Sequence, residues 1–242
     1  MRFICRNGGT LQVDGTTDTY DMHVWNVTLE SGRLYFAGTH ASYGAAGDGG
    51  PFGLRIDDPN VSVYSTGDSI LDLEDGNPNH LSYGKGAPVT FKVDDGTLTV
   101  RMTVSGDLNK TGAGAIRFDG ASGGSMRGVI NIKEGTLIAS EQLVNYNLNK
   151  VITLEGGTSL DISGLTGTFD FAAFQEAGGR LESNGRVTVI TGDRIIRNGD
   201  RLISWKTAPG CTFVPADAES PVGLVKKSDG LYAVVGMSIT IR

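Results

Sequence analysis

The chain has 242 residues, 36 of them glycine, and a formal net charge of −6. No run of Lys or Arg stands out, so the sequence argues against a nucleic-acid partner, whose phosphates require a concentrated basic face. No apolar stretch approaches the ~18 residues of a spanning helix, so we expect no membrane insertion by this segment.

A short phrase recurs from the N-terminus onward, in which alternating apolar residues lead to a glycine, then Thr or Arg, then further apolar residues. Copies lie at 27–36, 91–100, 130–138 and 152–160, with partial copies at 8–13 and 178–181. The step from Gly9 to Gly32 is 23 residues, and the steps from Gly135 to Gly157 and from Gly157 to Gly179 are 22 each. This period predicts stacked coils of β-structure whose alternate side chains point inward.

Two Gly- and Pro-rich stretches interrupt the repeats, and they predict loop insertions near 39–53 and 74–86. Loops on a rigid scaffold commonly carry the binding chemistry of a protein. The candidate ligand-binding residues are therefore Tyr43, Phe52, His80 and Tyr83.

Toward the C-terminus the repeat gives way to a different pattern of predicted elements. Residues 171–177 predict a short helix that Gly178 ends. Longer strand-like runs follow at 186–190, 202–205 and 231–235, separated by Asn-Gly and Asp-Gly turns that favour antiparallel hairpins. We therefore expect parallel coils over 1–185 and a C-terminal antiparallel β cap over 186–242.

The clearest single repeat spans Lys110–Phe118 and Gly128–Leu137. It resembles the autotransporter-associated β-strand repeat, whose pattern is approximately K-T-G-x-G-x-L-x-L, a turn, then G-x-x-x-V-x-x-G-T-L. The resemblance implies an all-β, right-handed parallel β-helix from the passenger region of a bacterial autotransporter or from a large secreted repeat protein. It also implies an extracellular or cell-surface location. Passengers of this kind include adhesins, stalks and enzymes, so the resemblance leaves the activity open.

An acidic group near residue 72 offers candidate metal ligands. Asp72, Glu74 and Asp75 lie beside a turn, where carboxylates and carbonyl groups can hold Ca²⁺. Leu71 and Leu73 occupy positions at which a calcium loop requires ligands, so the main interpretation is a solvated strand face. We expect no cofactor, with structural calcium as the alternative.

Catalytic motifs are incomplete. Lys110-Thr111-Gly112 and the S-x-x-K run that begins at Ser82 match two boxes of penicillin-binding enzymes, but the third box, S-D-N, is absent. Asp94 and Asp95 form an adjacent pair at a turn, which is a common place for solvated acids. We predict no catalytic residue.

Two cysteines, Cys5 and Cys211, lie near opposite ends of the chain. Stacked strands are ~4.8 Å apart, so about ten coils would separate the two cysteines far beyond the ~7 Å reach of a disulfide. Free, buried thiols are the main interpretation, and a bond between molecules is the alternative.

The leading hypothesis is a non-catalytic stalk or adhesive passenger that contacts a host surface or glycan through its loops. The first alternative is a carbohydrate-active β-helix of the polysaccharide lyase or tailspike kind, which requires acids converging on one lateral groove. The second is a self-associating extracellular fibre subunit that stacks through an uncapped first coil at 3–13.

Overall fold

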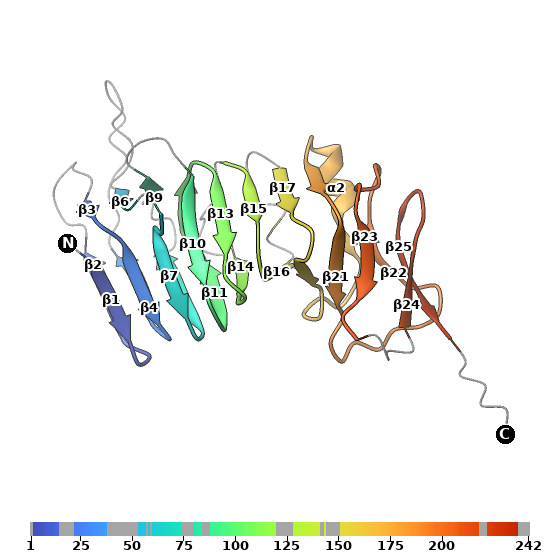
Figure 1. Cartoon of the computed structure of the whole chain (residues 1–242), viewed down its shortest axis with the longest axis horizontal. Helices are drawn as coiled ribbons and strands as arrows, with labels where there is room; N and C mark the ends of the chain where they lie inside the picture. Colours follow the sequence, from blue (N-terminus) through green and yellow to red (C-terminus); the bar gives the residue numbers. More distant parts are fainter. Residues whose placement is uncertain are drawn as a thin grey trace.

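The computed structural model describes residues 2–14, 22–37, 53–56, 58, 60–73, 80–83, 88–119, 128–140, 143, 151–217 and 222–236. Within these residues the chain is nearly all β, with two long parallel sheets, A and B, that extend along the molecule (Figure 1). Sheet A contains β1 (Phe3–Arg6), β4 (Val27–Glu30), β7 (Val63–Thr66), β10 (Val89–Val93), β13 (Leu108–Thr111), β15 (Ile130–Ile132), β17 (Val151–Leu154) and β20 (Arg180–Ser183). Sheet B contains β2 (Thr10–Asp14), β5 (Arg33–Ala37), β8 (Ser69–Leu73), β11 (Thr97–Val100), β14 (Ala115–Phe118), β16 (Thr136–Ile138), β18 (Ser159–Asp161), β21 (Arg186–Ile190) and β23 (Thr212–Pro215).

The repeated phrase of the sequence corresponds to one corner of the molecule. Each full copy supplies a strand of sheet A, a tight turn and the following strand of sheet B, and we call this unit a pass. In the pass of β10 and β11, Gly96 has a φ of +63°, a conformation that glycine adopts at low cost. The predicted strand–turn–strand unit is therefore confirmed for the copies at 27–36, 91–100, 130–138 and 152–160.

Sheets A and B supply much of the core, because alternate residues of each strand point inward, and sheets C and D add further buried side chains to it. Leu98, Ile116, Leu137 and Leu160 are register partners on four successive strands of sheet B, and each is at most 1% exposed. Burying one such side chain stabilises the fold by about 1.5–3 kcal/mol. Since each pass buries its apolar side chains against its neighbours, stability depends on stacking.

A third parallel sheet, sheet C, covers part of the N-terminal half. It contains β3 (Met22–Val24), β6 (Gly53–Ile56), β9 (His80–Tyr83) and β12 (Thr103–Ser105). Strand β9 lies inside the segment predicted as a loop at 74–86, and β6 begins at the end of the segment predicted as a loop at 39–53. Strand β9 is stabilised by pairing with β6 on one side and β12 on the other. The sequence did not predict this strand, because turn-forming residues lie close to it.

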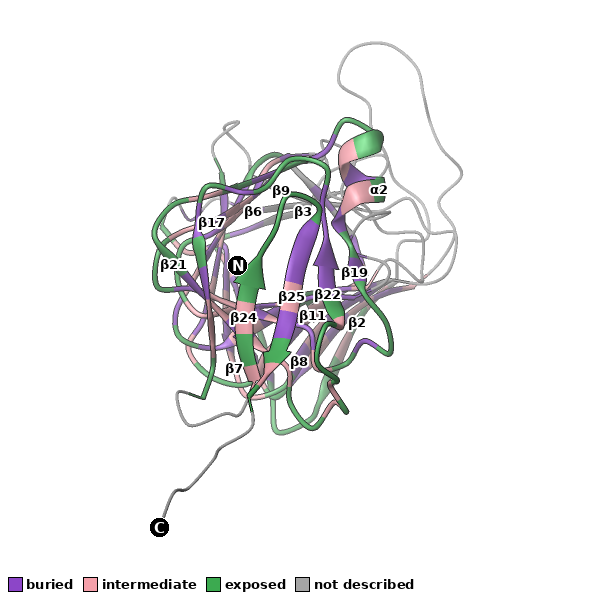
Figure 2. Cartoon of the chain, turned by 90° about the vertical axis from the view of Figure 1, so that its right-hand side faces the viewer, coloured by how far each residue is buried: buried purple, intermediate pink, exposed green. Residues whose placement is uncertain are grey.

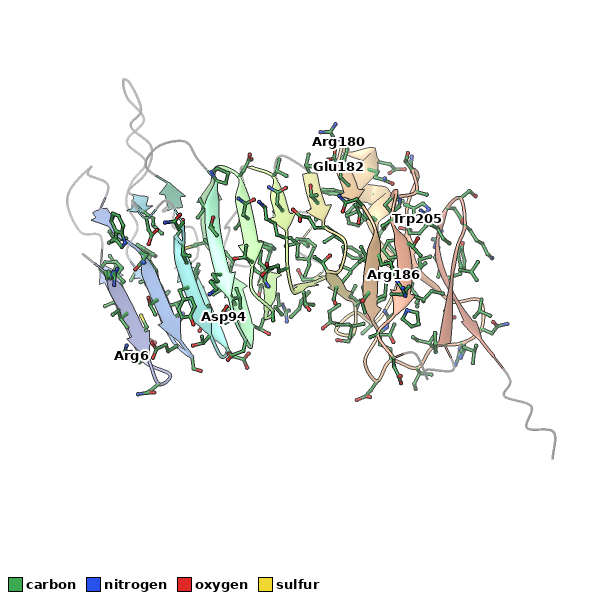
Figure 3. All side chains as sticks on the ribbon, viewed as in Figure 1. Arg6, Asp94, Arg180, Glu182, Arg186 and Trp205 are labelled. Atoms are coloured by element: carbon green, nitrogen blue, oxygen red, sulfur yellow. The ribbon has the colours of Figure 1, made fainter. Side chains whose placement is uncertain are left out.

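The C-terminal part contains a mixed sheet, sheet D, which Figure 2 shows nearly face on. Its strands are β19 (Phe169–Asp170), β22 (Arg201–Ser204), β25 (Gly230–Val235) and β24 (Val222–Lys226), in that order. Strand β25 pairs antiparallel with both β22 and β24. The inner side of the sheet is buried, and Trp205, labelled in Figure 3, stacks on Phe213 with 5.8 Å between ring centroids.

Several predictions for this region can be compared with the structure. The helix is confirmed as α2 (Phe171–Glu176), where Asp170 accepts a hydrogen bond from the backbone N–H of Ala173 at 3.2 Å. The hairpin before Gly230 is confirmed, as it joins β24 to β25. The hairpin expected at Asn198–Gly199 is wrong, because β21 belongs to sheet B and β22 to sheet D.

The parallel stacking continues past residue 185. Strands β21 and β23 extend sheet B to residue 215, while β19 already belongs to sheet D at 169–170. The partial copy at 178–181, which Gly179 marked in the repeat, does not form a corner. Gly179 precedes a strand of sheet A, and the corner glycine of this pass is Gly185, which has a φ of +75°.

Candidate functional site

Charged side chains form a continuous chain across neighbouring strands of sheet B. Arg33 Nε lies 3.0 Å from Asp72 Oδ2, and Arg101 Nη1 lies 3.8 Å from the same oxygen. Arg101 Nε in turn lies 3.3 Å from Asp119 Oδ2. The side chain of Asp72 is only 4% exposed, so its charge is compensated within the protein and it is poorly placed to act as a catalytic base.

Acids and an amide at the corners also bond between passes. Figure 3 shows Arg6 and Asp94 on the same lower edge of the molecule, where the corners between sheets A and B are stacked. At this edge a side-chain oxygen of one pass accepts a backbone N–H of the next or previous pass: Asp68 from Thr97, Asp95 from Gly67, Glu134 from Gly112 and Asn184 from Gly156.

Asp94 likewise bonds to a neighbouring pass, because it accepts a hydrogen bond from the Tyr64 hydroxyl at 3.0 Å. It also lies 3.4 Å from Lys92 Nζ. Asp94 and Asp95 therefore lie at the predicted turn, with Asp95 exposed to solvent, and both also bond to the preceding pass.

Lys110 is a fully buried cation in the interior of the stack. Its register partners in sheet A are Phe91 and Ile132, so it occupies an inward-facing, otherwise apolar position. Its Nζ donates to the carbonyl oxygens of Gly112, Gly114 and Glu134, the last at 2.9 Å. The ammonium group thus binds together the corners of two consecutive passes.

Burial lowers the pKa of Lys110 from its usual 10.5 to about 8, against the opposing effect of the nearby Glu134 and Asp94 carboxylates. Lysines with lowered pKa values can serve as general bases. Here all three hydrogen bonds go to backbone carbonyls inside the fold. Ser82, the serine of the second penicillin-binding box, lies in β9 of sheet C, whereas Lys110 lies in sheet A.

The residues predicted to bind a ligand are only partly within the described structure. Tyr43 and Phe52 lie outside the described residues. His80 and Tyr83 are the first and last residues of β9, so their backbones belong to a strand and not to an irregular loop. The structure therefore assigns no common site to these four residues.

The candidate metal ligands are similarly divided. Asp72 faces the guanidinium groups of Arg33 and Arg101, while Glu74 and Asp75 lie outside the described residues. Two neighbouring cations make Asp72 a poor calcium ligand. In the part of the chain that the structure describes, no three His, Cys, Asp or Glu side chains are grouped as metal ligands.

Cys5 and Cys211 are both free and buried, which confirms the main interpretation of these residues. Burial raises the pKa of both thiols, so the unreactive thiol form is favoured. The positions of the two cysteines, together with the predicted stack of coils, were sufficient for this prediction.

A groove of about 930 Å³, which we call the C-terminal groove, lies between three segments: 163–168, 192–196 and 200–202. Arg194 joins two sides of it, because its guanidinium donates to Gly167 O at 2.8 Å and to Ile162 O at 3.3 Å. Thr168 Oγ1 donates to Arg201 O at 2.7 Å. In the sequence these segments show only Gly, Ser and Thr turn signals, so no motif indicated the groove.

None of the described helices has the length and apolar character needed to cross a membrane. No protein-family model, curated protein or solved structure matches this chain.

Proposed function

We propose that the chain is a non-catalytic structural and adhesive segment of a bacterial surface or secreted repeat protein. In this proposal sheets A, B and C form a right-handed parallel β-helix, and sheet D caps its C-terminal end. The resemblance of Lys110–Phe118 and Gly128–Leu137 to the autotransporter-associated repeat supports the family, the handedness and the extracellular location.

The observation that supports the proposal most directly is that charged side chains form bonds between neighbouring passes. Asp72, Asp95 and Glu134 each bond to a neighbouring pass, and the buried Lys110 does the same. Catalytic acids and bases need a free proton-accepting or donating group that faces substrate. These groups instead connect successive passes, as a rigid stalk requires.

The test is a comparison of protease resistance and polysaccharide breakdown in the same preparation. We expect the folded chain to resist a non-specific protease, and to release neither reducing ends nor unsaturated uronates from neutral or acidic polysaccharides. Breakdown of any of these polysaccharides that disappears in Asp72→Asn or Asp119→Asn would overturn the non-catalytic assignment.

A carbohydrate-active enzyme is the second candidate, because Asp72 and Asp119 converge with Arg101 on one side of sheet B. Acids beside a basic residue are the arrangement that a lyase or hydrolase requires. Compensation of Asp72 by two arginines weighs against it. The breakdown assay above separates the two candidates directly.

Self-association is a third candidate, supported by the ends of the sheets. Strands β1 and β2 are terminal in sheets A and B among the described strands, and Ile4 on β1 is 50% exposed. An unpaired strand edge can pair with another chain. We expect Ile4→Lys to reduce any concentration-dependent association in light scattering, while Thr28→Lys, its register partner on β4, leaves it unchanged.

A further inference from the structure

We propose that the C-terminal groove binds a short neutral oligosaccharide. This assignment deepens the adhesive part of the proposed function and is independent of the handedness and stalk role. It rests on the shape of the groove, on its amphipathic lining and on the balance of positive and negative charges in that lining.

The groove is held in shape before any ligand arrives. Arg194 connects the 192–196 segment to the carbonyls of Ile162 and Gly167, and Asp161 Oδ1 accepts the Ser163 N–H at 2.8 Å. On another side, Asp200 accepts the Arg197 N–H at 2.7 Å. A ligand therefore loses little affinity to ordering of the walls.

The lining combines apolar and hydroxyl groups. Ile195 supplies apolar surface, since it is 90% exposed, whereas Leu165 and Leu202 are buried at 8% and 1% exposure and support the groove from beneath. Ser163 and Thr166 add hydroxyl groups to the lining. A pyranose ring has both apolar C–H faces and hydroxyl groups, so its two kinds of surface match these two kinds of lining.

The charges of the lining balance, because it holds two aspartates, Asp193 and Asp200, and two arginines, Arg194 and Arg201, which favours a neutral ligand. The Arg194 guanidinium is bonded to two carbonyl groups, and Arg201 Nη1 lies 3.7 Å from the Asp229 carboxylate. Among the residues that the structure describes, neither Arg194 nor Asp193 makes an ion pair, and Asp193 also makes no side-chain hydrogen bond. A carboxylate of this kind can accept hydrogen bonds from sugar hydroxyl groups.

The size of the groove fits a ligand of a few sugar units. Its 930 Å³ is near the upper end of the ~300–1,000 Å³ range of small-molecule sites. None of the described residues that line it is aromatic, so they offer no ring on which a sugar can stack. We therefore expect weak binding, with a dissociation constant of about 0.1–1 mM.

Glycine 167 offers a way to fill the groove without disturbing the fold. A Cβ atom added there would meet no atom within 4 Å, and Gly167 is not among the residues with positive φ. We expect Gly167→Trp to block the groove. Gly236→Trp is the matched control, because Gly236 has the same free space and lies outside the groove.

The experiment is a calorimetric and NMR titration of the full chain with neutral gluco-, manno- and galacto-oligosaccharides of three to six units. Sulfated oligosaccharides and oligolysine serve as charged comparison ligands. We expect saturable binding of at least one neutral series, unchanged by added salt, lost in Gly167→Trp, retained in Gly236→Trp and weakened about tenfold or more in Asp193→Asn.

Three outcomes would overturn the assignment. They are no neutral binding at concentrations well above about 1 mM, binding that Gly167→Trp retains, and salt-sensitive binding of oligolysine alone, which would make the groove a site for a cationic peptide. Melting temperatures of all variants are measured in parallel. If the fold is intact and no sugar binds, the assignment of sugar binding to the groove is refuted and the stalk proposal still stands. If polysaccharide is broken down, the non-catalytic assignment is refuted and the groove assignment still stands.

Discussion

Phe91 and Lys110 are register partners on adjacent strands of sheet A, and both side chains are completely buried. An aromatic ring and an ammonium group thus occupy equivalent interior positions in consecutive passes. The ring gains stability by leaving water, whereas the ammonium group requires acceptors to compensate for its lost hydration. The carbonyls of Gly112, Gly114 and Glu134 supply them.

Replacement of Lys110 by Met should therefore destabilise the protein even though methionine is apolar and similar in length. The substitution removes the Nζ donor from the carbonyls of Gly112, Gly114 and Glu134, of which Gly114 keeps the Thr136 N–H, and we expect a loss of about 2–4 kcal/mol in the free energy of unfolding. Urea denaturation measures this loss. Lys133→Met, at an exposed position on the next pass, should cost less than about 0.5 kcal/mol, and equal losses in both variants would contradict the proposed role of Lys110.

The lowered pKa of Lys110 predicts a specific pH dependence. The folded protein releases this proton near pH 8, whereas the unfolded chain holds it until about 10.5. Between these values the unfolded state binds more protons, so the contribution of this group to stability becomes more favourable as pH rises. Burial raises the pKa of the Cys5 thiol, which acts in the opposite direction above about pH 9.

Comparison with Lys110→Met isolates the lysine, since the other groups titrate alike in both proteins. The difference in unfolding free energy between the natural chain and the variant should shift in favour of the natural chain from pH 8 to pH 9.5. A difference that stays constant over this range would show that Lys110 keeps its ordinary pKa.

The sequence was sufficient to predict the corner units, because alternation and glycine spacing are local properties. It was insufficient at Gly179 and Gly185, where two glycine-containing turns lie six residues apart and only strand pairing distinguishes them. The role of Lys110 also depends on pairing, since an inward-facing lysine breaks the apolar alternation. The C-terminal groove combines segments about thirty residues apart that share no motif.

The pair of Arg33 and Asp72 should contribute more to stability than an exposed ion pair. Because the Asp72 side chain is only 4% exposed, water and salt screen its charge poorly. A double-mutant cycle with Arg33→Ala and Asp72→Ala should give a coupling of about 1 kcal/mol that persists at high salt. The same cycle on Lys92 and Asp94, at 43% and 36% side-chain exposure, should give less than about 0.5 kcal/mol.

Alanine substitutions at Gly96 and Gly157 separate two costs to stability, which are backbone strain and a steric clash between neighbouring passes. Both have positive φ, at +63° and +93°, so alanine strains the backbone in either place, at a cost of about 1–2 kcal/mol. A Cβ atom at Gly96 would also lie 2.4 Å from the carbonyl carbon of Gly67 in the preceding pass, whereas one at Gly157 would meet nothing within 4 Å. Gly96→Ala should therefore cost at least about 2 kcal/mol more than Gly157→Ala in urea denaturation.

The Gly96→Ala substitution should also shorten the survival time of the protein in protease, because the backbone clash forces two passes apart. Equal effects of the two substitutions would mean that the close approach of these corners contributes nothing to the stability of the stack.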